Sequence, residues 1–128
     1  HTFGRLVAGI ARARLLRNQG SLKMITVSVL YPRTEGGRFD FDYYVKVHMP
    51  MSIRLLGDAI KAVSVERGLA SAEPGGPPAY VALCHFTCET QADFEDAFFP
   101  NAAELQGDMP NYTDIAPVIQ INEIALTK

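Results

Sequence analysis

The 128-residue chain has the size and composition of one globular domain, since 48% of its residues are hydrophobic and 20% are charged. Residues 1–23 hold five of the 12 basic residues and no acidic one, so the rest of the chain is acidic and offers no basic surface to nucleic acid. No apolar run is long enough for a membrane span, and Cys84 and Cys88 are too far apart on one predicted strand for a disulfide, which together favour the cytoplasm.

Residues 1–23 precede the first convincing strand and follow helical spacing imperfectly. The chain opens with His1, whereas Met24 stands directly before that strand. We therefore interpret residues 1–23 as an N-terminal extension, either artificial or from a misassigned start, and residues 24–128 as the domain.

Residues 25–31 alternate with period two and predict the first strand. Asp40 is a suitable cap for a helix whose apolar residues recur at the i, i+3, i+4, i+7 spacing, and Pro50 is expected to divide that helix into two pieces before Gly57. Residues 62–69 are rich in β-branched side chains and predict the second strand.

A loop rich in Gly and Pro leads into residues 80–88, which are almost uniformly apolar and predict a third strand. Thr90 caps a second helix that Pro100 interrupts, and residues 118–124 form the last strand. The order strand, helix, strand thus occurs twice. It predicts an α+β, ferredoxin-like βαββαβ fold with an antiparallel four-stranded sheet.

Both central strands carry apolar residues on both faces, whereas the helices of this fold cover only one face. A second copy of the sheet is the simplest cover for the other face, because two-fold association lets one apolar patch bury itself. The pattern therefore predicts a homodimer.

Two runs carry a resemblance to a known family. The first combines the strand Ile25–Pro32 with the segment from Arg38 to Pro50, which contains Asp-x-x-Tyr-Tyr-x-x-x-His-x-Pro, and the second is Asn-Tyr-Thr-Asp-Ile at residues 111–115 with residues 117–121. Together they resemble the ethyl tert-butyl ether degradation (EthD) family over nearly everything after Met24. The resemblance implies a dimeric α+β barrel, bacterial pathways that degrade ethers and other organic compounds, and an oxidoreductase-linked role without settled chemistry. Similar barrels include cofactor-free monooxygenases and cyclases as well as haem enzymes, so the fold selects no reaction.

His48 is the candidate catalytic residue, because its helical spacing places an ionisable ring on an apolar stripe just before Pro50. An imidazole exchanges a proton near neutral pH, as a general acid or base must. The structural alternative is that His48 only donates to a backbone carbonyl freed by Pro50 and so fixes the helix.

The candidate substrate-binding residues are His85 on the third strand, the hydroxyls of Tyr43, Tyr44 and Tyr112, and the carboxylate of Asp114. His85 joins His48 only if its face of the strand looks into the same cavity, and otherwise it is a satisfied core residue. Each of the others also has a structural reading, as a core residue or as part of a turn.

No metal site is predicted, because His85 points to the opposite side of its strand from Cys84 and Cys88. No cofactor is expected either: there is no phosphate-binding Gly-rich loop and no haem-attachment motif, which leaves His48 as the only weak candidate for a haem ligand.

Two functions remain. In one, the protein is a cofactor-independent enzyme that acts on a small hydrophobic organic compound with His48 as acid or base. In the other, it is a non-catalytic accessory module that binds such a compound for an oxygenase system.

Overall fold

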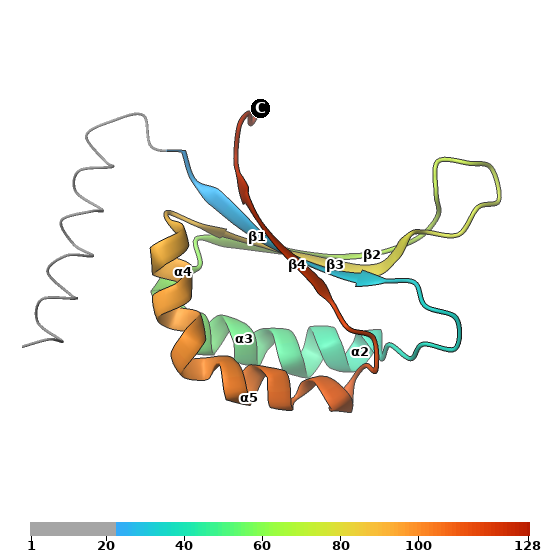
Figure 1. Cartoon of the computed structure of the whole chain (residues 1–128), viewed down its shortest axis with the longest axis horizontal. Coiled ribbons are helices and arrows are strands. Elements are labelled where there is room, and N and C mark those ends of the chain that lie inside the picture. The colour runs from blue at the N-terminus through green and yellow to red at the C-terminus, as the bar shows by residue number, and fades with distance from the viewer. Residues whose placement is uncertain (1–22) are drawn as a thin grey trace, which may run out of the picture.

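The structure, a computed structural model, describes residues 23–128 as one antiparallel sheet with helices on a single face (Figure 1). The strands are β1 (Ile25–Pro32), β2 (Ala62–Arg67), β3 (Tyr80–Cys88) and β4 (Val118–Glu123). The first helical segment comprises α2 (Phe41–Tyr43), a π-helical turn (Tyr44–His48), α3 (Met49–Leu56) and a 3₁₀ turn (Gly57–Ala59). The second comprises α4 (Gln91–Phe98), a 3₁₀ turn (Phe99–Asn101), α5 (Ala102–Gly107) and a 3₁₀ turn (Met109–Asn111).

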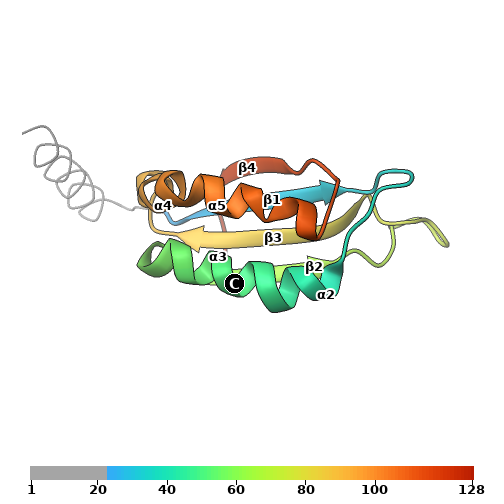
Figure 2. The same ribbon diagram turned by 90° about the horizontal axis from the view of Figure 1, so that it is seen from below.

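The strands lie in the spatial order β2-β3-β1-β4, and all neighbouring pairs are antiparallel. Figure 2 shows α3 along the β2 and β3 side of the sheet and α4 and α5 along the β1 and β4 side. This arrangement confirms the predicted α+β class and the ferredoxin-like βαββαβ order.

The predicted strand bounds hold closely, and β3 matches its prediction at both ends. The second strand ends earlier than expected, at Arg67. Gly68 still donates its backbone N–H to the carbonyl of Val81, at 3.0 Å, but Leu69 has already left the sheet and is 85% exposed. The strand propensity of Leu69 therefore does not keep it in the ladder, although β3 continues to Tyr80.

The first helical segment begins as predicted, because the Asp40 carboxylate accepts the N–H of Tyr43 at 3.1 Å. Pro50 does not break the segment. Instead the turn before it widens into a π-helix, in which Met49 donates to the carbonyl of Tyr44. A proline has no N–H to donate and its ring crowds the preceding turn, so the wider turn accommodates it at the start of α3. Gly57, with φ of 59°, ends the helix.

The second helical segment also follows its prediction. Thr90 caps α4 by accepting the N–H of Asp93 at 3.0 Å. Pro100 lies in the 3₁₀ turn that separates α4 from α5. Both helical segments thus depart from regular α-helix near a proline, through a π-helical turn in the first and a 3₁₀ turn in the second.

The two faces of the sheet differ in burial. On β3 the residues beneath the helices are buried, whereas those on the outer face are only partly covered. The buried set is Ala82, Cys84, Phe86 and Cys88, and the outer set is Val81, Leu83, His85 and Thr87.

Two other sequence predictions concern the chain as a whole. Among the helices of residues 23–128, none is long and apolar enough to cross a membrane. The helical spacing noted at the N-terminus falls on residues 1–22, which lie outside the described residues.

Candidate functional site

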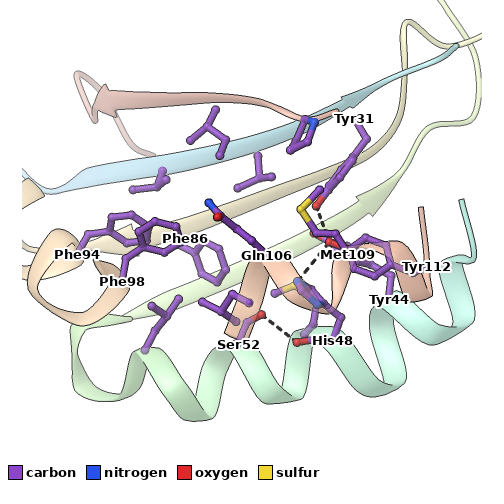
Figure 3. A pocket seen from close by; sticks show the side chains of 17 residues that line it. Tyr31, Tyr44, His48, Ser52, Phe86, Phe94, Phe98, Gln106, Met109 and Tyr112 are labelled. Carbon is purple, nitrogen blue, oxygen red and sulfur yellow. Dashed lines mark hydrogen bonds between the residues drawn. The ribbon is translucent and has the colours of Figure 1, made fainter. Parts of the chain in front are cut away.

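A cavity of about 290 Å³ lies between the helices and the sheet. Its walls come from β1, β3, β4 and both helical segments, as Figure 3 shows. The lining residues are Val27, Val29, Tyr31, Tyr44, His48, Met49, Ser52, Leu56, Phe86, Phe94, Phe98, Leu105, Gln106, Met109, Tyr112, Pro117 and Ile119. No charged Lys, Arg, Asp or Glu is among them, so the cavity suits an uncharged, mainly apolar molecule.

Except for the carboxamide of Gln106, the polar groups of the cavity gather at one end, around His48 (Figure 3). This side chain is buried, in the π-helical turn that precedes α3. Its Nδ1 atom lies 2.9 Å from Oδ2 of Asp108, which stands between α5 and the following 3₁₀ turn. Its Nε2 atom lies 3.3 Å from the hydroxyl of Tyr112. The ring is therefore held from both sides.

Asp108 is held in its charged form. Partial burial acts to raise the pKa of its carboxyl group, but hydrogen bonds donated by Tyr43, Asn111 and His48 outweigh that effect and bring the pKa below its usual value. Tyr43 donates its hydroxyl to Oδ1 at 2.7 Å, and Asn111 donates its side-chain amide to the same oxygen at 2.9 Å. A carboxylate can only accept, so the Nδ1 atom of His48 must carry the proton in this hydrogen bond.

The tyrosine hydroxyls continue this arrangement into the cavity. The hydroxyl of Tyr31 lies 2.9 Å from that of Tyr112, and both side chains are buried. Burial raises the pKa of Tyr112 and of Tyr44 far above the usual tyrosine value. Burial also raises the pKa of Tyr31, although its hydrogen bonds with Tyr112 and Tyr44 act against it. These phenols are neutral at physiological pH.

The structure brings three of the predicted site residues together. His48, Tyr44 and Tyr112 line the cavity, and the His48 and Tyr44 rings stack with their centroids 5.6 Å apart. Tyr43 does not line the cavity, but its hydroxyl binds the Asp108 carboxylate that holds His48. Of the five residues predicted to accompany His48, three thus contribute to its surroundings: Tyr43, Tyr44 and Tyr112.

Asp114 and His85 lie elsewhere. The carboxylate of Asp114 accepts the backbone N–H of Arg38 at 2.7 Å and so fixes the loop that leads into α2. His85 is on the outer face of the sheet, opposite the cavity, where its Nδ1 lies 2.8 Å from the Ser28 hydroxyl and its Nε2 lies 3.1 Å from Glu66. The two histidines therefore do not approach one cavity in this chain.

The helix-fixing alternative for His48 is wrong in its detail. The ring binds a carboxylate and a phenol, not a backbone carbonyl, and the carbonyl of His48 itself accepts the hydroxyl of Ser52 at 2.9 Å. Asp108 and Tyr31 were not predicted as site residues from the sequence. The signal for Tyr31 was its place on the inward side of the first strand, but nothing local marked Asp108, which is distant from His48 in sequence.

The thiols are not reactive groups of this site. Burial raises the pKa of Cys84 to about 12 and that of Cys88 to about 11, so both stay protonated. Residues 23–128 contain no group of three or more His, Cys, Asp or Glu side chains placed to hold a metal ion.

The fold and the site define a class: a ferredoxin-like α+β domain with an apolar cavity between sheet and helices and a His–Asp pair at one end. The chain belongs to the EthD family, because the family model for the EthD domain matches residues 38–116, more than half of the chain. The match includes His48 and Asp108 as well as Tyr112.

Two solved structures are similar. An EthD-like protein from Ralstonia eutropha JMP134 is 49% identical, with a TM-score of 0.80 over 83% of this chain and 96% of that one. An ethyl tert-butyl ether degradation family protein from Bacillus halodurans C-125 is 17% identical, with a TM-score of 0.55 over 78% of this chain and 97% of that one, and shares the fold. A search of the curated proteins finds no match.

The lowered pKa of Asp108 gives stability a defined pH dependence. An unfolded aspartate has a pKa of about 3.9, so the stabilisation from this carboxylate is complete above that pH and is lost as the pH falls through the lower folded value. Asp108→Asn should therefore cost about 1–2 kcal/mol near neutral pH, and the difference from the wild type should shrink below about pH 4. Urea unfolding across pH measures this, with Asp96→Asn on the exposed surface of α4 as the control. A constant difference at all pH values would contradict the ionised pairing.

Proposed function

We propose that the protein binds a small, mainly apolar organic molecule in the cavity and uses His48 as a general acid or base on it. The observation that carries the proposal is the His48–Asp108 pair at one end of a mainly apolar cavity whose lining includes no Lys, Arg, Asp or Glu. A carboxylate fixes the tautomer of the imidazole, and the second ring nitrogen is hydrogen-bonded to Tyr112, which lines the cavity; this arrangement suits proton transfer.

The apolar wall supplies binding. The rings of Phe94 and Phe98 stack with centroids 5.4 Å apart, and Phe86 adjoins Phe94 at 6.3 Å. Aromatic walls favour a flat or branched hydrocarbon body, and the size of the cavity suits a compact molecule. Membership of the EthD family supports a place in the degradation of such compounds, with an oxidoreductase-linked role.

The accessory role is the competing proposal. It shares the cavity and the ligand but involves no turnover, and delivery to an oxygenase system would then be the purpose of binding. The oriented imidazole favours the enzyme, because an apolar cavity binds a hydrophobic molecule without a hydrogen-bonded His–Asp pair.

We also propose that two copies associate through the outer face of the sheet. Leu30 and Leu83 are only half-buried there, and Val118 on β4 is 48% exposed. A two-fold contact between identical faces would cover these residues and enclose the polar group formed by Ser28 and His85. The domain that associates is residues 24–128, with residues 1–23 as an extension.

Occupancy of the cavity can be tested by filling it. Val29→Phe places a ring inside the cavity and should abolish binding of small substituted benzenes and branched alkyl ethers, while Leu69→Phe adds the same ring to an exposed loop and should leave binding intact. At a ligand concentration of 100 times Kd the wild type should gain about 2.7 kcal/mol of stability, measured by thermal unfolding. Equal ligand stabilisation of wild type and Val29→Phe would remove the cavity from the proposal.

Turnover separates the enzyme from the accessory module. His48→Asn should lower turnover at least about 100-fold, because general acid or base catalysis contributes that much, and should change ligand affinity only about twofold. Product analysis by mass spectrometry, with unfolding as the check on the fold, gives both quantities. Absence of product with the wild type and with every bound ligand of the panel would favour the accessory role.

The dimer is tested on the outer face. Leu83→Lys places a charge at its centre, opposite Glu66 on β2, so the monomer should tolerate it while the dimer dissociates. Sedimentation velocity should show the wild type and Leu69→Lys as dimers and Leu83→Lys as a monomer. A Leu83→Lys variant that sediments like the wild type would place the contact elsewhere.

A further inference from the structure

The polar end of the cavity is a continuous chain of hydrogen bonds. It runs from Asp108 to His48 at 2.9 Å, from His48 to Tyr112 at 3.3 Å, and from Tyr112 to Tyr31 at 2.9 Å. Figure 3 shows its inner part, where Tyr31, Tyr112 and His48 meet beside Met109. The chain joins a carboxylate outside the cavity lining to a hydroxyl on its wall.

The charged end fixes the direction of every bond in the chain. In the neutral form of His48, which is the form that can take up a proton, Nδ1 carries the hydrogen because the Asp108 carboxylate only accepts, and Nε2 has only a lone pair. Tyr112 must then donate its hydroxyl to Nε2, and Tyr31 must donate its own to Tyr112. The oxygen of Tyr31 is left with a lone pair and no proton of its own to offer.

This direction selects the polar group of a ligand. A ligand that only accepts, such as an ether, finds no free proton at Tyr31, whereas a hydroxyl can donate to it. A ligand with a permanent charge finds no opposite charge among the lining residues, and burying an unpaired charge is very unfavourable.

Resting on the function proposed above, we infer that the ligand is a neutral, mainly apolar molecule with one weakly acidic hydroxyl, of the phenol or enol class, which donates to Tyr31 and delivers its proton to His48 along the chain. The ligand O–H bond breaks and its proton joins Tyr31. The proton of Tyr31 passes to Tyr112, and that of Tyr112 passes to Nε2 of His48. The products are a ligand anion and an imidazolium, with no oxidant or reductant involved.

Asp108 compensates the positive charge that this transfer creates on His48. The imidazolium forms 2.9 Å from a carboxylate, and the ligand oxygen stays hydrogen-bonded to the re-protonated Tyr31. Neighbouring titratable groups do not compete for the proton. Burial keeps Tyr44 and Cys84, which face Tyr31 from the π-helical turn and β3, in their neutral forms, and Tyr43 is engaged with Asp108.

The pair 4-nitrophenol and 4-nitroanisole tests the inference, because the two probes differ only in the proton that the first can donate. The wild type should bind 4-nitrophenol about tenfold more tightly than 4-nitroanisole, the preference that one neutral hydrogen bond provides. Tyr31→Phe should reduce the ratio to about one with unchanged affinity for 4-nitroanisole. Tyr80→Phe, a tyrosine at the start of β3 outside the cavity lining, should keep the ratio.

Absorbance reports the proton itself. Bound to the wild type below the pKa of the free probe, 4-nitrophenol should show its phenolate band, and Asp108→Asn should bind it without that band because the imidazolium has lost its counterion. Circular dichroism confirms that each variant is folded. Equal affinity of the wild type for both probes, or a preference that survives Tyr31→Phe, would overturn the inference while leaving a cavity that binds ligands. Binding of neither probe would count against the proposed function and the inference together.

Discussion

The Asp108 carboxylate is the group on which the rest of the site depends. It accepts hydrogen bonds from the phenol of Tyr43, the amide of Asn111 and the imidazole of His48. Tyr43 and His48 belong to the first helical segment and Asn111 to the second, so these bonds form together only when the two segments are docked. The charge of this one group orders the neighbouring polar hydrogens, including those of tyrosines that it does not touch. Without a fixed acceptor at that position, the imidazole and the phenols would each have two equivalent orientations.

The backbone makes this pairing possible. Pro50 widens the preceding turn to a π-helix, and His48 stands at the end of that turn, where its ring reaches both Asp108 and Tyr112. π-helical turns are rare and occur often at functional sites, because they change the direction of a side chain without ending the helix. The Ser52 hydroxyl, bonded to the carbonyl of His48, satisfies a backbone acceptor in the same turn.

The sequence predicted the fold well, because periodicity, caps and prolines are local signals. Asp40 and Thr90 cap the helices as expected, and the outer and inner faces of β3 alternate as its position in the sheet requires. The site was predicted only in part. His48 stood out by its residue type, but Asp108 is separated from it by most of the domain, and only the docking of the two helical segments brings them together. The position of His85 depends on which face of the sheet the helices cover, and the alternation of residues along the strand does not determine that face.

The partners of the polar chain come from opposite halves of the duplicated βαβ pattern. His48 and Tyr31 belong to the first half, whereas Asp108 and Tyr112 belong to the second. Every hydrogen bond of the chain therefore joins one half to the other. Contacts so distant in sequence form only after long loops have closed, late in folding. The site is thus a product of tertiary assembly, and a nascent chain acquires it only when its C-terminal half has emerged and docked.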